Sequence, residues 1–321
     1  MLIVSFGGPQ GREDVLPFLE HVVQGRNVPP ARLLEVAEHY YHFGGRSPIV
    51  DQTRSLADAV RAELQCHGPR LPVYQGNRNW HPFIEDTVRT MATDGVKRTL
   101  AFVTSAFGSY SSCRQYLEDI ARARAAIGGT APEIAKMRLF YNHPLFLELW
   151  TERLRAARLE APKADVLFTA HSIPMAMAAA SPYAGQLHEA AAAVAAAAGA
   201  ERWSLAFQSR SGSPQQPWLE PAVEAELERL QASGAAGVIL VPLGFLTAHM
   251  EVAYDLGVEA RDLCRRLGLP MMLVPPIGDH PRFAGLVREL ILERCDARHP
   301  RLSAGPGAAW PDDCPDGHCQ F

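Results

Sequence analysis

The chain has 321 residues, of which 47% are hydrophobic and 21% are charged, and its formal net charge is −4. These values are typical of a soluble globular protein with one large or two ordinary domains, and they provide no overall basic field for nucleic acid or anionic lipid. No run approaches the ~18 apolar residues of a membrane span, and Met1 leads into LIVSFGG without a secretory leader. We therefore expect a cytoplasmic protein that is not embedded in a membrane.

Short apolar runs alternate with longer amphipathic stretches along almost the whole chain. Continuous apolar strands separated by helices are typical of parallel sheets that are covered on both faces. We predict strands at residues 2–6, 72–75, 98–104, 137–141, 165–170, 203–208, 237–242 and 271–275. Between them lie helical patterns such as PFIEDTVRTMATDG, SSCRQYLEDIARARAAIG, PAVEAELERLQASG and FAGLVRELILERC.

Four predicted strands are followed by four more, which indicates an α/β protein with two similar doubly wound, Rossmann-like domains. Each domain is expected to contain a parallel four-stranded sheet, with a ligand cleft between the domains at the carboxyl ends of the strands. We expect the domains to span residues 1–150 and 151–298, followed by an irregular, cysteine-containing tail at 299–321. The sequence GGPQG at 7–11 lacks the spacing of a dinucleotide-binding loop.

His171 follows the predicted strand 165–170 directly, within the sequence TAHSIP. A histidine in this position can simply cap a helix or pack locally. However, a neutral imidazole at the carboxyl end of a buried parallel strand can also accept a proton or ligate a metal. Its place at the mouth of the expected cleft favours the functional interpretation.

Glu251, Asp255 and Glu259 form an acidic row at positions i, i+4 and i+8 of a predicted helix. Like charges at this spacing repel each other, and the flanking positions on that face are Thr247 and Leu263, which carry no compensating charge. The row can be a solvated helix face. It can also be a track of carboxylates that passes protons or holds a divalent cation.

Polar residues also follow two segments of the first half. Arg46 and Ser47 lie in HYYHFGGRSP, and Arg114 and Tyr116 lie in SAFGSYSSCRQY. Such groups suit the carboxylates of a ligand, because a guanidinium matches a carboxylate with two parallel hydrogen bonds. The alternative is ordinary helix capping and surface charge.

Six motifs in order make the chain resemble the ferrochelatase family, and most closely the actinobacterial coproporphyrin ferrochelatases of heme biosynthesis. The motifs are SFGGP, HYYHFGGRSP, GNRNWHPFIEDT, TAHSIP, QSRSGSPQQPWLEP and GFLTAHMEVAYD, and the resemblance extends from residue 2 to about residue 298. It implies a porphyrin cleft between two domains, with His171 and Glu251 as the catalytic pair facing each other across it and binding the metal. It also implies that Asp255 and Glu259 continue the row as a proton or metal track on a π-type helix.

The resemblance further implies which residues contact the porphyrin. These are Phe6, Arg26, Arg46, Ser47, Arg114 and Tyr116. Three positions depart from the pattern of the family. Phe6 stands where some relatives have a tyrosine that approaches the iron, Gln24 stands where relatives usually have an arginine, and Ala248 stands where they usually have an aspartate.

The resemblance implies insertion of ferrous iron, a substrate, into coproporphyrin III to give coproheme. Coproporphyrin III has four propionates and is water soluble, and the chain lacks the apolar lip of relatives that use protoporphyrin IX. A monomer that hands its product to a coproheme decarboxylase is the expected arrangement. The alternatives are a protoporphyrin IX ferrochelatase, a cobalt chelatase acting on sirohydrochlorin, and a non-catalytic porphyrin-binding protein, which would not need the acidic row.

Two cysteines lie in the tail, in the sequence CPDGHCQF, and these thiols can simply be free. Related actinobacterial enzymes hold a 2Fe–2S cluster with one cysteine at the position of Cys113 and three near the C-terminus. The resemblance therefore implies such a cluster on Cys113, Cys314 and Cys319. His318 and Cys295 are the two candidates for the fourth ligand.

Overall fold

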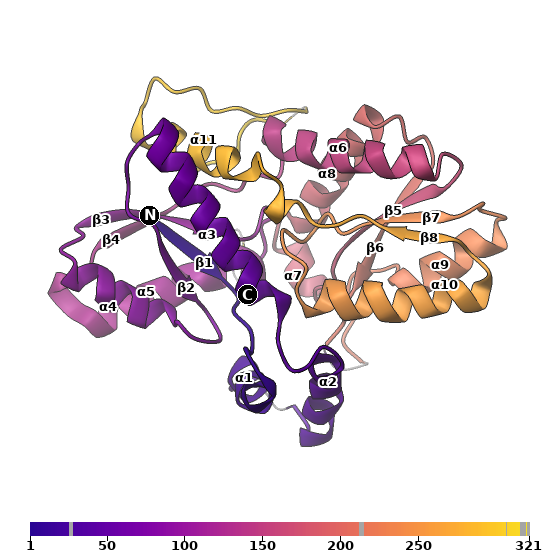
Figure 1. Ribbon diagram of the computed structural model, residues 1–321, viewed down its shortest axis with the longest axis horizontal. Coiled ribbons are helices and arrows are strands. Elements are labelled where there is room, and N and C mark those ends of the chain that lie inside the picture. Colours follow the sequence, from indigo (N-terminus) through magenta and orange to yellow (C-terminus); the bar gives the residue numbers. More distant parts are fainter. Residues whose placement is uncertain (26–27, 212–214, 306, 315–318, 320–321) are drawn as a thin grey trace.

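Each half of the chain forms one four-stranded, all-parallel sheet, and the two sheets lie side by side in the computed structural model, which describes residues 1–25, 28–211, 215–305, 307–314 and 319 (Figure 1). The strand order is β2-β1-β3-β4 in the first sheet and β6-β5-β7-β8 in the second. The first sheet contains β1 Leu2–Ser5, β2 Tyr74–Asn77, β3 Arg98–Val103 and β4 Glu133–Lys136, and the second contains β5 Asp165–His171, β6 Trp203–Gln208, β7 Val238–Val241 and β8 Met271–Leu273. The repeated order confirms the predicted pair of doubly wound units.

Helices cover both sheets, as expected for parallel strands made of buried apolar residues. The first half contains η1 Arg12–Asp14, α1 Val15–Val22, α2 Pro30–His42, α3 Pro48–His67, α4 Ile84–Thr93, the π-helix η2 Tyr110–Arg114, α5 Gln115–Ile127, η3 Gly128–Thr130 and α6 Pro144–Glu160. The second contains α7 Met175–Ala179, α8 Tyr183–Ala197, α9 Val223–Ala232, the π-helix η4 Glu251–Ala260, α10 Arg261–Leu267, η5 Ile277–Asp279 and α11 Phe283–Cys295. Among the described residues, none of these helices has both the length and the apolarity needed to cross a membrane.

The strand order reverses beside β1 and beside β5. In each sheet the next strand along the chain lies on one side of this strand, and the one after it lies on the other side. Open α/β sheets bind ligands at such switch points, outside the carboxyl ends of the strands. Phe6 follows β1, and His171 is the last residue of β5. Both therefore lie at the edge where the architecture favours a ligand.

The predicted strand at residues 137–141 is wrong. The fourth strand is β4, and the backbone after it leaves the sheet once the amide of Met137 has bonded to the carbonyl of Ala101 at 2.9 Å. Residues 137–141 are buried nonetheless, because they belong to the hydrophobic core, where the ring of Phe140 packs against those of Phe102 on β3 and Phe146 on α6. Their apolar character reflects this burial and not strand pairing.

Helix α11 comes from the second half of the sequence but packs against the first half (Figure 1). The ring of Phe283 meets that of Phe102 on β3, with their centroids 6.3 Å apart. The guanidinium of Arg138 donates to both carboxylate oxygens of Glu293, at 2.6 and 2.9 Å, and these two side chains are only 1% and 4% exposed. The boundary at residue 150 stays a prediction, and α11 contributes to the packing on both sides of it.

Candidate active site

His171 and Glu251 form an ion pair at the carboxyl end of β5. The imidazole Nε2 lies 3.3 Å from Glu251 Oε1, and the two side chains remain 32% and 38% exposed. Glu251 is the first residue of η4, which reaches β5 because residues after β7 pass closely over it: a Cβ on Gly244 would lie 2.6 Å from the Cβ of Ala170. The expectation that the pair faces each other across the cleft is therefore wrong. Both residues belong to the second half, and no macrocycle can fit between them.

The pair holds one proton on the imidazole at neutral pH. Burial acts to lower the pKa of His171, but the charge of Glu251 and the hydrogen bond to it outweigh burial and raise this pKa to about 9. Burial likewise acts to raise the pKa of Glu251, and the charge of His171 outweighs it and lowers this pKa to about 2. The ring Nδ1 bonds the carbonyl of Ser172, which fixes the orientation of the imidazole.

The acidic row stands on a π-helix, a rare geometry that is frequent at functional sites. Burial and the charge of Glu251 raise the pKa of Asp255 to about 7, and the hydroxyl of Ser209, which donates to the Asp255 carboxylate, opposes this shift. Glu259 is exposed as a whole, but partial burial of its carboxylate and the charge of Glu224 raise its pKa. The row therefore begins with an ionised carboxylate beside His171 and continues to a group that titrates near neutrality.

The loop before η4 is attached to the first half of the chain. The amide of Ala248 donates to Oε1 of Gln52 on α3 at 2.7 Å, so this contact links the two halves next to the site. His249 follows, and its Nδ1 accepts from the amide of Glu251 at 3.2 Å. Ala248 has no side-chain donor or acceptor, and in this chain the loop is positioned by Gln52 instead.

Two aromatic residues of the first half, Phe6 after β1 and Tyr40 on α2, belong to the candidate site. Phe6 is 38% exposed, although it packs edge-on against Phe18 with centroids 6.2 Å apart. Burial, followed by the charges of Glu251 and Asp255, raises the pKa of Tyr40 on α2, which places this phenol near the acidic row. Tyr40 lies within the motif HYYHFGGRSP but was not among the predicted site residues.

Helix α2 also contacts the π-helix directly. The ring of His39 stacks on that of Tyr254 with centroids 3.8 Å apart, and His42 meets the same ring edge-on. In Figure 1, α1 and α2 lie together below the two sheets, with α2 toward the second half. The first half thus reaches the acidic row through α2.

The predicted porphyrin contacts have different environments. Ser47 is buried at the start of α3, and Tyr116 is buried beneath the guanidinium of Arg78, which lies 5.6 Å from its ring. Arg46 and Arg114 are exposed, and they pair with Asp51 and Glu118 respectively. Arg26 lies outside the described residues. The porphyrin contacts stay predictions.

Arg78 is a further basic residue that sequence analysis did not select. Its Nε lies 3.0 Å from Asp119 Oδ2, and the two side chains are 15% and 9% exposed. It stands in the motif GNRNWHPFIEDT, directly after β2. Its position at a strand end was the available signal.

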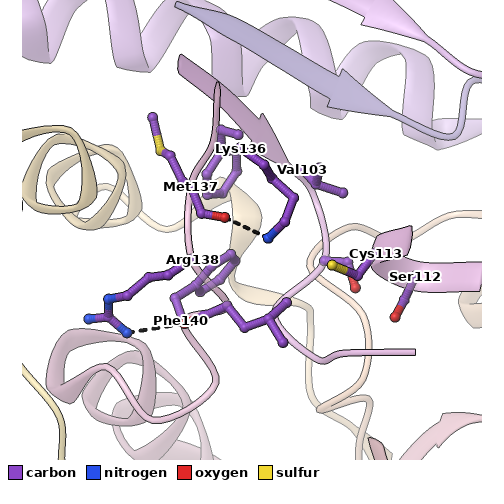
Figure 2. Close-up of a pocket in the computed structure, with 10 residues that line it drawn as sticks. Val103, Ser112, Cys113, Lys136, Met137, Arg138 and Phe140 are labelled. Carbon is purple, nitrogen blue, oxygen red and sulfur yellow. Dashed lines mark hydrogen bonds between the residues drawn. The ribbon is translucent and has the colours of Figure 1, made fainter. Parts of the chain in front are cut away.

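The three cysteines expected to bind a cluster, Cys113, Cys314 and Cys319, lie near one another. The thiol of Cys113, on η2, forms a hydrogen bond with that of Cys314, and this bond together with burial raises the pKa of Cys113. The nearby Cys319, which is itself buried, contributes to raising the same pKa. Cys113 lines a small cavity of about 10 Å³. The buried Lys136 lines the same cavity, and its Nζ donates to the carbonyl of Met137 at 2.7 Å (Figure 2).

These thiols do not supply a complete ligand set. In the part of the chain that the structure describes, no three His, Cys, Asp or Glu side chains are grouped closely enough to hold a metal ion. His318 lies outside the described residues, and Cys295 is exposed at the end of α11. The described residues therefore do not fit a four-ligand 2Fe–2S cluster by themselves.

Known proteins resemble the chain over its whole length. A family model described as ferrochelatase matches residues 1–295. A ferrochelatase of Rhodopirellula baltica is 46% identical over 325 residues, covering 100% of this chain and 93% of that protein. Coproporphyrin III ferrochelatases of Nocardia farcinica and Frankia alni are each 49% identical over 99% of this chain, and the matches cover 96% and 85% of those proteins.

Solved structures resemble the fold at much lower sequence identity. SirB from Bacillus subtilis superposes with a TM-score of 0.56 at 12% identity, covering 93% of this chain and 98% of that chain. DR2241, a multi-domain protein of Deinococcus radiodurans with similarity to chelatases, has a TM-score of 0.56 at 16% identity, covering 90% of this chain and 54% of that chain. These similarities support a chelatase-type fold with two Rossmann-like units.

Proposed function

The chain belongs to the ferrochelatase family, and on that premise we propose that it inserts ferrous iron into coproporphyrin III to give coproheme for heme biosynthesis. Insertion of a metal into a porphyrin is the activity of the family. To this activity the proposal adds that the metal is ferrous iron and the porphyrin is coproporphyrin III, and it assigns the residues that take part. The observation that carries it is the His171–Glu251 ion pair, because it places an imidazole and a carboxylate, two groups that can take part in proton transfer, 3.3 Å apart at a strand end.

Metallation of a porphyrin releases two pyrrole protons for each metal ion that enters. Glu251 is ionised at neutral pH and can accept the first proton directly. His171 already carries a proton, so it becomes a base only after that proton has left. We assign this transfer to the acidic row, in which Asp255 has a pKa of about 7 and can both accept and release a proton near neutrality.

The opposite side of the porphyrin is assigned to the first half of the chain. The phenyl ring of Phe6 offers an apolar face and no oxygen ligand, so protein ligands for the iron come from the side of His171 and Glu251. Imidazole nitrogen and carboxylate oxygen are both ligands that ferrous iron accepts. The same two residues would thus bind the metal and receive the protons that it displaces.

The choice of coproporphyrin III rests on its four carboxylates and on the names of the relatives from Nocardia farcinica and Frankia alni. Arg46 and Arg114 have exposed guanidinium groups, and exposed ion pairs such as theirs are weak, so a ligand carboxylate can replace Asp51 or Glu118. Ser47, Tyr116 and Arg26 complete the proposed propionate contacts.

An anaerobic metallation assay with ferrous iron tests the proposal. We expect faster metallation of coproporphyrin III than of protoporphyrin IX, and a preference for protoporphyrin IX would overturn the choice of substrate. Faster insertion of cobalt into sirohydrochlorin would overturn the reaction itself. Tight porphyrin binding without metallation of any of the three would indicate a non-catalytic carrier.

We further propose that the protein acts in the cytoplasm as a monomer and passes coproheme to a decarboxylase. Light scattering on purified protein tests the monomer, because a dimer would have twice the 35.1 kDa mass of the chain. Transfer of coproheme to a purified decarboxylase, faster than the spontaneous release of coproheme into buffer, tests the second statement.

A further inference from the structure

Two consecutive residues at the end of β6, Gln208 and Ser209, contact two successive members of the acidic row. Gln208, which ends β6, donates from Nε2 to the backbone carbonyl of Glu251 at 2.5 Å. Ser209, the next residue, donates its hydroxyl to Oδ2 of Asp255. The dipeptide thus bonds the backbone of the first carboxylate residue and the side chain of the second.

Ser209 has a backbone conformation that L-residues rarely adopt. Its φ is +61°, in the left-handed region that favours glycine, and among the described residues only one other non-glycine residue, Cys319, has a positive φ. Strain of this kind persists only when the surrounding structure imposes it, and it is concentrated at functional sites. At this position it turns the hydroxyl from the end of β6 toward η4.

The segment is anchored in the same sheet as the catalytic histidine. Gln208 pairs with His171 in the register of β5 and β6, and its carbonyl accepts from the amide of Ser172 at 2.8 Å. The strand ends that carry His171 and Ser209 are therefore neighbours within a rigid element. A site on such elements holds its side chains more precisely than one on loops.

We propose that Ser209 is a positioning residue of metal insertion: its hydroxyl occupies Oδ2 of Asp255 and leaves Oδ1 to receive the proton that comes from Glu251. This inference rests on the proposed function. Gln208 holds the carbonyl of Glu251 and so keeps the start of η4 in register with β5. In this role Ser209 acts through Asp255, to which its hydroxyl is hydrogen-bonded, and is assigned no contact with porphyrin or iron.

The groups that face Asp255 come from four elements. They are Glu251 and Glu259 on η4, His171 on β5, Ser209 after β6 and Tyr40 on α2. Ser209 is a neutral donor among them, and its hydrogen bond lowers the pKa of Asp255, whereas burial and the charge of Glu251 raise it. Loss of the hydroxyl is therefore expected to make Asp255 easier to protonate.

Three variants test the proposal. Ser209→Ala removes the hydroxyl and keeps the backbone strain, whereas Ser209→Gly removes both, because glycine adopts a positive φ readily. Ser233→Ala is the matched control, since that hydroxyl donates to the carbonyl of Leu230 at 2.8 Å, at the end of α9. Rates of coproporphyrin metallation are measured as a function of pH, together with porphyrin affinity by fluorescence quenching.

We expect Ser209→Ala and Ser209→Gly each to lower the metallation rate about tenfold, with the acidic limb moved to higher pH and porphyrin affinity unchanged. Combining Ser209→Ala with Asp255→Asn should cause no further loss beyond Asp255→Asn alone, because the two residues act as one unit. Wild-type rates and an unmoved limb in both Ser209 variants would overturn the proposal, as would full activity in Ser209→Gly alone, which would reduce the role to backbone strain. Failure of the proposed function has a different signature, namely that the wild-type protein itself forms no coproheme.

Discussion

The imidazole of His171 and the carboxylate of Glu251 meet at 3.3 Å although 80 positions separate them in the numbering, and the contact joins the end of β5 to the start of a π-helix. The two groups form a charged pair that shares one proton on the nitrogen. In the proposed reaction, Glu251 can therefore accept a pyrrole proton directly, whereas His171 can accept one only after it has released the proton that it already carries. The acidic row behind Glu251 is the route that the charges favour.

Glu251→Gln is expected to lower metallation by about 10²–10⁴-fold, the usual contribution of a general base, and to leave the fold intact. The same change removes the charge that holds the proton on His171, so the pKa of this imidazole should fall from about 9 toward or below its ordinary 6.5. Steady-state assays and NMR titration of the ring measure the two effects. Glu228→Gln, on the exposed side of α9, is the control, and undiminished turnover in Glu251→Gln would refute the assignment.

Asp255→Asn is expected to stabilise the fold while it impairs the enzyme. The pKa of Asp255 is about 7 in the folded chain against an ordinary 3.8, so the favourable contribution of its protonated form is present below 3.8 and is lost as the pH rises through 7. At pH 8 the ionised carboxylate is thus unfavourable, and the amide should raise the free energy of unfolding by about 1–2 kcal/mol. Urea unfolding at pH 8 and pH 5 should show the larger gain at pH 8, with Asp86→Asn on exposed α4 as control.

The metallation rate of the wild-type protein is expected to fall on the acidic side near pH 7. Asp255 accepts a proton only when it is ionised, and burial together with the charge of Glu251 raises its pKa to about 7. A pH profile of the rate at saturating porphyrin, between pH 6 and 8.5, measures the limb. A flat profile over this range would show that Asp255 does not take part in the rate-limiting transfer.

Gln52→Ala is expected to loosen the loop that precedes η4. The change removes the acceptor that the Ala248 amide uses, which should lower the free energy of unfolding by about 1 kcal/mol and the rate of metallation several-fold. Gln52→Glu retains an oxygen at the same place and should restore most of the activity. Equal activity in Gln52→Ala and the wild type would mean that the loop is held by other contacts.

Alkylation of the native protein should distinguish two classes of cysteine. Cys66 and Cys295 are exposed and should react first, whereas Cys113 and Cys264 are buried and burial contributes to raising the pKa of both thiols. Thiolates and not thiols react with iodoacetamide. Mass spectrometry of digests taken over time measures the order, and early labelling of Cys113 would show that its contact with Cys314 is transient.

The fold was largely predictable because periodicity reports burial, and burial is what a doubly wound sheet imposes on its strands. The same logic produced the error at residues 137–141, where an apolar run is buried without any strand partner. The acidic row could be recognised from the sequence because its three carboxylates share one helix face and the flanking positions on that face carry no compensating charge. Its partner Ser209 was not, because its role depends on a backbone angle that a serine in a sequence does not reveal.

The arrangement of the proposed catalytic pair was predicted incorrectly for a similar reason. Strand ends could be identified from the sequence, but which side of the site η4 occupies depends on how the loop after β7 passes over β5. That passage depends on the absence of a side chain at Gly244. Gln52 could not be identified from the sequence, because its partner is the backbone amide of a residue 196 positions away.

The pairing of Arg138 with Glu293 has a consequence for how the chain is made. The two residues are separated by 155 positions. At a synthesis rate of about 5–20 residues per second, Glu293 is therefore added to the chain on the order of 10–30 s after Arg138. During that interval the parts of β3 and α3 that α11 later contacts lack this helix (Figure 1). We expect the emerging first sheet to be a client of ribosome-associated chaperones, and truncation before residue 283 to leave a first half that aggregates although its own sheet is complete.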